Sequence, residues 1–574
     1  MMRMNASLTT SLVVLTLCVP FAGCGGGGGG GSSEEGYVDF VAQDCAWVGH
    51  GEVTAIAEIE DRLTAYAETD LTADITTLTA SERQVLDKLV AAARIMHELF
   101  WAQACPCREE ITAVLDRATG PGAEAARAYF QINMGPWDRR FGREPFCGHW
   151  EHPEGANYYP LDLTEAEKEQ ISSNQNRLGD LFTMVRRDDS GALVAIPYSE
   201  FFKDELEQAA GLLREAAAIT DNESLRLFLE SRADAFLSDD YYESDMLWMD
   251  LDSRVEITIG PYETYEDGLF GFKAAFEAFV TVVDPEGSAR LDRFKGELPW
   301  LEANLPIPDQ YKNPNRGAES PIRVADEYFT AGDTRAGVQT IAFNLPNDER
   351  VREAKGSKKV MLRNIMNAKF EQILVPIANR LLAEGQLPDL TGESFFLHTL
   401  LHEMSHGLGP GNIVVDGRPT EVRLELKDHY STIEEAKADL MGEWAIFQLM
   451  DKGLFEPTLY RQQAATYLAG LFRSVRFGIE EAHGQANAIQ FNYLLSRGGI
   501  QYDEETQRFR VNLAEFRSVI ERMVNSICVL QAEGNYTAAH KMVTNYGVMS
   551  PELEQALARL TDLPADIKPI FVVE

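Results

Sequence analysis

Apolar residues recur at intervals of three or four positions along most of the chain, which is the spacing of amphipathic helices. Two of these segments open with the pattern of a capping box, Ser81-x-x-Gln84 and Thr164-x-x-Glu167. In such a box, two side chains satisfy the first free N–H groups of the helix. The periodicity predicts four helices in the first part of the chain: 82–104, 164–185, 199–219 and 223–237.

Strand-like runs are fewer, namely Arg254–Ile259, Phe279–Val283, Val338–Phe343 and a hairpin over Ile500–Val511. Helical periodicity returns from residue 355 and includes one long pattern from about 457 to 496, which Gly498 and Gly499 end. We therefore predict a predominantly helical α+β protein. It divides into a helix-rich N-terminal region over 37–240 and a mixed region over 241–574 that carries the candidate chemistry.

The first residues have the pattern of an export signal rather than of a folded domain. Arg3 precedes an uncharged apolar run, Leu8–Ala22, which is too short to span a membrane. Residues 1–24 end in Phe21-Ala22-Gly23-Cys24, which resembles a bacterial lipobox, and the Gly/Ser-rich residues 25–36 predict a flexible tether. We expect an exported cell-envelope lipoprotein anchored in the membrane by lipidated Cys24, with Gly26 favouring the outer membrane. The alternative is a cleaved secretory signal with an incidental cysteine.

The charge of the chain narrows the range of partners. The sequence has 574 residues and is 45% hydrophobic, so a sizeable core is expected, and its formal net charge is −38. So acidic a surface repels phosphate backbones, which argues against nucleic acid as a partner. The five cysteines beyond the signal permit up to two disulfides, whose pairing the sequence does not determine: Cys45, Cys105, Cys107, Cys147 and Cys528.

The most informative stretch is His402-Glu403-Met404-Ser405-His406. His402 and His406 are one helical turn apart, so both imidazoles leave the same face and can bind one metal ion. Glu403 is rotated by about 100° from His402, which puts it beside the metal, where a general base belongs. His398 lies a turn earlier, too far along a straight helix to join both histidines on one ion, and we expect it to pack or to support a ligand. The motif predicts a zinc site.

A catalytic zinc usually has three protein ligands, and a second acidic helix can supply the third. Glu434, Glu435 and Asp439 stand at the start of another amphipathic pattern, and Glu435 and Asp439 are four apart on one face. One of these two can complete the metal site, while the other can orient a ligand histidine through its free ring nitrogen.

These residues resemble the dipeptidyl peptidase III family of zinc exopeptidases. That family has HExxGH followed by EExxAE or EExxAD, and HEMSH here matches the shorter form of a bacterial and plant branch. Further stretches resemble the family in order along the chain, over about residues 125–500: 135–139, 155–160, 255–260, 263–267, 279–283, 344–348 and 482–486. The resemblance implies a two-lobed zinc peptidase with a cleft between a mixed α/β lobe and a helical lobe carrying the HExxH motif.

The resemblance also implies a role for each matching residue of the metal centre. It makes His402, His406 and Glu435 the ligands of one Zn²⁺ ion per chain. It makes Glu403 the general base and acid, with Glu434 and Asp439 supporting the ligands.

On the substrate side, the resemblance implies that Glu256, Asn344 and Asn347 hold the N-terminal ammonium of a short peptide. A carboxylate and two amide oxygens suit that cation, because its charge is paired and its donors are accepted. His483 would stabilise the oxyanion of the tetrahedral intermediate.

Two positions depart from the family pattern. Its transition-state tyrosine falls at Thr258, and an arginine after the catalytic histidine falls at Asn487. A threonine side chain is shorter than tyrosine, and its hydroxyl is a weaker acid than a phenol. Stabilisation of the oxyanion is therefore expected to be poorer by a few kcal/mol unless Tyr262 or Tyr265 substitutes.

The function expected from the resemblance is hydrolysis of peptide bonds near the N-terminus of short peptides by a zinc dipeptidyl-peptidase-like enzyme. One alternative is an endopeptidase or aminopeptidase with the same metal centre, and another is a catalytically silent lipoprotein that binds peptides. Nucleotide hydrolysis is set aside, because the sequence has no GX5EX7REUXEEXGU pattern of the Nudix domains that join some plant relatives.

Overall fold

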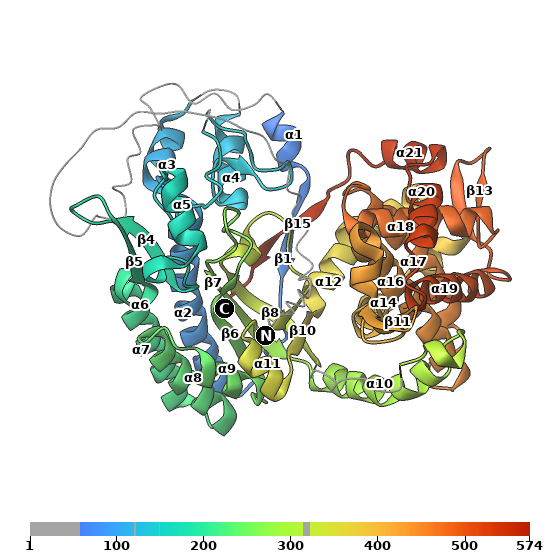
Figure 1. The fold of residues 1–574 in the computed structure, drawn as a ribbon, viewed down its shortest axis with the longest axis horizontal. Coiled ribbons are helices and arrows are strands. Elements are labelled where there is room, and N and C mark those ends of the chain that lie inside the picture. Colours follow the sequence, from blue (N-terminus) through green and yellow to red (C-terminus); the bar gives the residue numbers. More distant parts are fainter. Residues whose placement is uncertain (1–57, 120–121, 149, 314–321, 574) are drawn as a thin grey trace.

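The computed structural model describes residues 58–119, 122–148, 150–313 and 322–573. Two lobes lie side by side (Figure 1): a sheet lobe built on a five-stranded sheet, and a helical lobe. The predicted α+β class with helices in the majority is confirmed. The expected signal peptide, tether and Cys24 lie outside the described residues. Among the residues that are described, no helix is long and apolar enough to span a membrane.

The central sheet of the sheet lobe has the strand order β6-β7-β8-β10-β9. Neighbouring strands are antiparallel except β8 and β10, which are parallel. The bounds are β6 Val255–Glu263, β7 Ala275–Val283, β8 Ile322–Ala331, β9 Ala342–Leu345 and β10 Lys358–Leu362. Every residue of β6 is buried, so this strand lies inside the lobe along its whole length.

Helices from before residue 240 lie against this sheet, so the sheet lobe draws elements from both of the predicted regions. The larger ones are α2 Ala80–Ala104, α7 Lys203–Ile219 and α8 Glu223–Phe236. The smaller ones are α1 Ile59–Leu63, α3 Arg108–Arg117, α4 Ala123–Asn133, α5 Glu165–Ser172 and α6 Tyr198–Phe201. The lobe also contains two short helices from after residue 240, α9 Tyr242–Met249 and α11 Glu349–Lys355. Two short strand pairs complete the lobe: β2 Trp137–Asp138 with β3 Glu144–Pro145, and β4 Thr183–Arg187 with β5 Leu193–Pro197.

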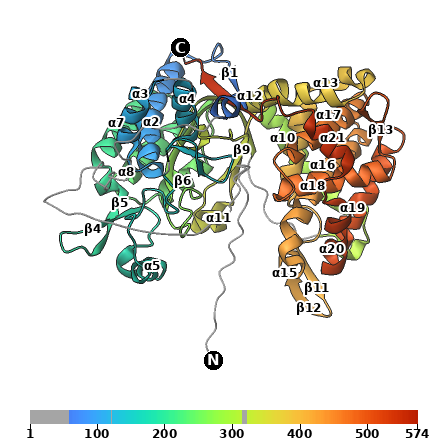
Figure 2. The same ribbon diagram turned by 90° about the horizontal axis from the view of Figure 1, so that it is seen from above.

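The helical lobe contains the candidate chemistry. Its helices are α14 Gly392–Ser405, α15 Val422–Leu426, α16 Tyr430–Asp451, α17 Leu459–Val475, α18 Ala482–Ser496, α19 Phe516–Ala532, α20 Tyr536–Tyr546 and α21 Pro551–Ala558. Its hairpins are β11 Asn412–Val415 with β12 Arg418–Glu421, and β13 Ile500–Asp503 with β14 Arg508–Val511, the second of which was predicted. In Figure 2, α15 and the β11–β12 hairpin extend outward from this lobe.

Three connections between the lobes can be followed through the described residues. α10 (Pro285–Ala303) begins beside the sheet and ends at the helical lobe, where Glu302 accepts a hydrogen bond of 2.8 Å from the Gly409 N–H. The second is α12 (Arg363–Lys369), continued by a π-helical turn over Phe370–Leu374 and by α13 (Val375–Leu381). The third is the last strand, β15 (Asp566–Phe571), which returns to pair in parallel with the first strand, β1 (Tyr66–Leu71).

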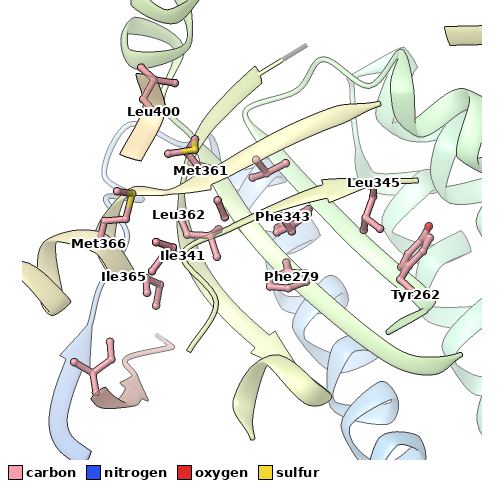
Figure 3. Close-up of a cluster of buried hydrophobic side chains, with 14 of the residues drawn as sticks. Tyr262, Phe279, Ile341, Phe343, Leu345, Met361, Leu362, Ile365, Met366 and Leu400 are labelled. Carbon is pink, nitrogen blue, oxygen red and sulfur yellow. The ribbon is translucent and has the colours of Figure 1, made fainter. Parts of the chain in front are cut away.

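A continuous apolar cluster connects the sheet with the helical lobe (Figure 3). Phe279 of β7 and Phe343 of β9 stack with ring centroids 4.2 Å apart. Met361 of β10, Met366 of α12 and Leu400 of α14 belong to the same cluster. The helix that bears the HExxH motif is therefore anchored against the sheet by apolar packing.

The predicted helices at 199–219 and 223–237 are observed as α7, preceded by α6, and as α8. The helix predicted at 82–104 is α2, but its capping box is formed by Thr79 and Glu82 rather than by Ser81 and Gln84. The Thr79 hydroxyl accepts from the Glu82 N–H, and the Glu82 carboxylate accepts from the Thr79 N–H. The helix consequently begins one residue before Ser81.

Two predicted helices were too long. The capping box of Thr164 and Glu167 is present, but α5 ends at Ser172, because Asn174, Asn176 and Arg177 adopt positive φ angles that break the helical path. The pattern over 457–496 forms two helices, α17 and α18, separated at Gly478, whose φ is +100°. Periodicity continues across both interruptions because the residues on either side pack against the same core.

Candidate metal centre

The two helices that carry the metal-binding motifs, α14 and α16, pack in close contact. Gly442 of α16 makes this approach possible, since a Cβ atom there would lie 2.9 Å from the main-chain N of His402. Gly484 has a similar role at the start of α18, where a Cβ atom would come within 1.8 Å of the Gly478 carbonyl oxygen. Glycine at these two positions lets three segments of the helical lobe converge on one point.

Three imidazoles meet at one carboxylate oxygen. The Oε2 atom of Glu435 lies 3.2 Å from Nε2 of His483, 3.4 Å from Nε2 of His402 and 3.8 Å from Nε2 of His406. One potential ligand atom from each of His402, Glu435 and His483 falls within 4.8 Å of the others. Glu435 Oε2 is buried and makes no hydrogen bond in the structure. The sequence predicted that Glu435 would join both motif histidines, but not that His483 would lie as near as they do.

The other ring nitrogen of each histidine is held by a carboxylate. His402 Nδ1 lies 2.6 Å from Asp439, His406 Nδ1 lies 3.0 Å from Glu434, and His483 Nδ1 lies 2.8 Å from Glu481. A carboxylate at Nδ1 fixes the orientation of a ring and leaves Nε2 to face a cation. All three rings are thus arranged as metal ligands usually are.

Asp439 also ties the centre to the surrounding helices. Asn487 and Gln490 of α18 donate to its second oxygen at 3.2 and 2.7 Å, and His398 Nε2 lies 3.4 Å from the first. His398 is held in turn by Glu443 at 2.9 Å. His398 therefore supports the centre from behind, and Asn487, where the family has arginine, binds Asp439.

Glu403 lies at the boundary between the lobes, where it meets a cation from the sheet lobe. Lys359 of β10 donates to Glu403 Oε2 at 2.6 Å and to its main-chain oxygen at 3.1 Å. Burial raises the pKa of the Glu403 carboxyl, but the Lys359 ammonium and the His402 and His406 rings outweigh burial and hold that pKa below its ordinary value. Glu403 is therefore ionised near neutral pH, as a general base must be.

The electrostatics of the centre suit a cation. Burial raises the pKa of the Glu434 carboxyl, but Lys437 and His406 bring it down to about 2. Burial lowers the pKa of the His483 ring, but Glu435 and Glu481 raise it to about 10. The carboxylates favour the protonated form of the neighbouring histidine rings, as expected of a site with an excess of negative charge. A divalent cation would compensate that charge.

The residues predicted to hold a substrate ammonium line the sheet lobe. Glu256 is buried and lies 3.7 Å from both Lys358 and Arg323, and Asn347 donates to the Tyr262 carbonyl at 2.9 Å. Asn344 has a buried Oδ1 without a hydrogen-bond partner. Glu256 thus already has cationic neighbours, whereas Asn344 keeps a free acceptor.

A cavity of about 330 Å³ begins at Asn347 and is lined by acidic and aromatic side chains, among them Asp239, Asp245, Tyr241 and Tyr262. Thr258 is buried in the middle of β6, opposite Phe279. Neither nearby phenol is placed to replace the family tyrosine, because the Tyr262 hydroxyl donates to Asp245 at 2.9 Å and Tyr265 is exposed.

Comparison with known proteins gives consistent matches. The family model "Peptidase family M49" matches residues 170–444. The fold is similar to the structure of DPP III from Caldithrix abyssi, with a TM-score of 0.86 and 49% identity over 90% of this chain and 99% of that one. It is also similar to dipeptidyl-peptidase III from Corallococcus sp. strain EGB, with a TM-score of 0.74 and 42% identity over 90% and 98% of the two chains.

Two further proteins are similar in sequence. Nudix hydrolase 3 of Arabidopsis thaliana is 35% identical over 89% of this chain and 74% of its own length. Dipeptidyl peptidase 3 of Homo sapiens is 22% identical over 71% of this chain and 62% of its own length.

Proposed function

The chain belongs to peptidase family M49, and on that premise we propose that it is a zinc exopeptidase that releases dipeptides from the N-termini of short peptides. The family resemblance expected from the sequence is confirmed. The observation that carries the proposal is the convergence of three imidazole Nε2 atoms on Glu435 Oε2, next to the ionised Glu403.

We assign the zinc ligands to His402, His406 and Glu435. The fit is supported by the buried Glu435 Oε2, which has no hydrogen bond, and by the carboxylates that hold both ligand histidines through Nδ1. Nitrogen and carboxylate donors of this kind suit zinc. A zinc ion held by these residues would supply Lewis acidity, which polarises a carbonyl and lowers the pKa of water toward about 7.

The side chains around the metal then have separable tasks. Glu403 takes a proton from the attacking water and returns it to the leaving amine, using a carboxylate that is ionised near neutral pH. His483, oriented by Glu481, donates from Nε2 to the oxyanion that develops on the substrate carbonyl. Asp439 and Glu434 keep the ligand rings in place.

At the other end of the scissile dipeptide, Asn344, Asn347 and Glu256 receive the N-terminal ammonium. Asn344 supports this assignment with its unpartnered Oδ1. The cavity beside Asn347, with its carboxylates and aromatic rings, provides room for a substrate side chain. Lys358 and Arg323 already compensate part of the negative charge of Glu256, so its attraction for the substrate ammonium is weaker than that of an unpaired carboxylate.

The test is mass spectrometry of products from a pool of oligopeptides, each offered with a free and with an acetylated N-terminus. We expect the zinc-loaded protein to release dipeptides from the free peptides alone, and Glu403→Ala to release none. Internal cleavage that is indifferent to acetylation would retain the metal chemistry and reject the ammonium site. Absence of any cleavage with zinc bound would leave the silent peptide-binding lipoprotein as the better hypothesis.

We further propose that the protein is exported and anchored to the membrane by a lipid on Cys24. Metabolic labelling with palmitate and membrane fractionation test this proposal. The sequence of residues 1–24 supports this proposal, as does the disulfide bond of Cys107, because disulfides persist in oxidising compartments. Cys24→Ser is expected to lose the label and to move from the membrane to the soluble fraction. Labelling that survives the substitution would reject Cys24 as the anchor.

A further inference from the structure

One contact between the lobes involves the proposed general base. Lys359 lies on β10 of the sheet lobe and Glu403 on α14 of the helical lobe, and their side chains are only 13% and 11% exposed. The ammonium donates to Glu403 Oε2 and to the main-chain oxygen of the same residue. Those two bonds fix both the carboxylate and the turn of helix that carries it.

The strand gives this lysine a defined direction. Side chains alternate between the two faces of a strand, so Lys359 and Met361 share one face of β10 and Lys358 lies on the other. Lys358 is directed at Glu256 and at the ring of Trp248, 4.3 Å from its centroid. Met361 belongs to the apolar cluster that includes Leu400, one turn before Glu403 on α14 (Figure 3). Apolar packing thus sets the distance across which Lys359 reaches Glu403.

The same strand position is linked to the proposed substrate site. Lys359 is the cross-strand partner of Asn344 in the antiparallel β9–β10 pair. Main-chain hydrogen bonds of such a pair hold the two residues at a fixed separation. A movement of the main chain at Asn344 would therefore be passed on to the main chain of Lys359.

We propose that Lys359 is a positioning residue, which holds Glu403 from the opposite lobe so that the general base is in place only when the lobes are together. This inference rests on the proposed function for the role of Glu403. With Oε2 engaged by the ammonium, Oε1 is the oxygen left to take the proton from water. Separation of the lobes would break this ion pair, so the contact also favours the arrangement of the lobes seen in this structure.

Steady-state kinetics of Lys359→Met and Lys359→Arg test the inference, with Lys355→Met as the control. Lys355 is a lysine of the same lobe that pairs with Asp250 at the surface. We expect kcat of Lys359→Met to fall roughly 100-fold, as for a misplaced catalytic group, with KM and bound zinc unchanged. Lys359→Arg, which keeps a cationic donor, is expected to recover most of kcat, and Lys355→Met is expected to match the wild type.

Small-angle X-ray scattering of the zinc-loaded, substrate-free variants gives a readout that is independent of activity. A larger radius of gyration for Lys359→Met than for the wild type and for Lys355→Met is the expected result. The inference is overturned by an unchanged kcat, by loss of zinc alongside activity, by Met and Arg variants that behave alike, or by equal radii of gyration. If the wild type released no dipeptides, the proposed function would fail by itself, while scattering would still decide whether Lys359 holds the lobes together.

Discussion

His406 and His483 differ in how the carboxylates that hold their rings are themselves held. Glu434, which holds His406, is itself held by Lys437 at 2.8 Å and by Gln531 at 3.0 Å. Glu481, which holds His483, belongs to the N-terminus of the same helix, α18, and accepts from the Gly484 N–H. His406 is thus supported by two further helices, whereas His483 is supported only locally. That difference suits a ligand and a catalytic donor respectively.

We expect His406→Ala to lose zinc and His483→Ala to keep it with a kcat lower by roughly 100-fold or more. The measurement is zinc per chain by atomic emission on the dialysed variants, alongside dipeptide release. His483 Nε2 lies nearer to Glu435 Oε2 than His406 Nε2 does, so zinc content is needed to tell ligand from donor. Zinc retained by His406→Ala and lost by His483→Ala would exchange the two roles.

Glu403→Gln removes the proton acceptor and keeps the shape of the side chain. General acid–base catalysis contributes roughly 10²- to 10⁴-fold, so kcat should fall by that factor while zinc content stays at the wild-type value. Single-turnover kinetics on a zinc-saturated sample separate this effect from metal loss. Wild-type turnover in a pure, metal-loaded Glu403→Gln variant would remove Glu403 from the mechanism.

Among the site residues, those with a local pattern could be predicted and those without one could not. The spacing of His402, Glu403 and His406 places them on one helix, and the acidic run at Glu435 marks the next. No local sequence pattern marks Lys359. The residue that it contacts lies in the other lobe, and the adjacent Lys358 is also a lysine, so the sequence does not distinguish the two. The bond from Asn487 to Asp439 depends on the packing of α18 against α16, which no spacing encodes.

The contact between α14 and α16 brings the two metal-binding motifs together. Its closest point is Gly442 against the main chain of Leu401 and His402, where there is no flexible side chain to move aside. Any side chain at Gly442 has to separate the helices. The proposed metal ligands would then move apart with them.

Gly442→Ala is expected to lower the free energy of unfolding by about 1–3 kcal/mol, the usual cost of overpacking, and to weaken zinc binding. Gly470→Ala is the matched control, since Gly470 also lies in a helix, α17, and a Cβ atom there meets nothing within 4 Å. That control should be neutral or more stable by up to about 1 kcal/mol. Chemical denaturation and zinc titration with a competing chelator provide the measurements. Equal zinc affinity in both variants would contradict the geometric argument.

Long amphipathic elements were the most predictable part of the fold, and short or non-local strands the least. α2, α7 and α8 were predicted from periodicity alone. β10 was missed because it opens with two lysines, whose charges are paired by Glu256 and Glu403 from elsewhere in the fold. β1 and β15 were missed because each is a strand only through its distant partner.

The helical lobe is held together by its proposed metal centre, and the two lobes are held together by the segments that join them. The proposed ligands come from α14 and α16, and His483 approaches from α18, so a bound cation links much of the helical lobe. Because zinc binds the folded state, it should stabilise the protein by about 4 kcal/mol when its free concentration is a thousand times Kd.

Removal of zinc with a chelator should therefore lower Tm in the wild type, and re-addition should restore it. Glu435→Ala, which lacks a proposed ligand, should have a Tm that does not respond to chelator. Differential scanning calorimetry of both proteins decides the matter. A wild-type Tm that is indifferent to the chelator would reject a metal that stabilises the fold.

The buried pair of Lys369 and Asp566 joins two of the connecting segments, α12 and β15. Their charged atoms are 2.8 Å apart, each side chain is only 1% exposed, and Asp566 also accepts from the Gln339 N–H. Asp566→Ala leaves the Lys369 charge buried without a counter-charge, with only the Gln339 carbonyl to accept from it, and should cost roughly 3–5 kcal/mol of stability. Asp562→Ala breaks an exposed pair with Arg380 and should cost under about 1 kcal/mol. Urea denaturation measures the free energy of unfolding of both variants. Equal decreases in that free energy would contradict the expected effect of burial on the Lys369–Asp566 pair.

The parallel pairing of β1 with β15 has a consequence for how the protein is made. β1 lies near the start of the described chain, and its only strand partner there lies at the far end. During synthesis the edge of β1 stays open until Asp566–Phe571 have left the ribosome, so this strand pair forms only after all five strands of the central sheet, β6 to β10, have been made.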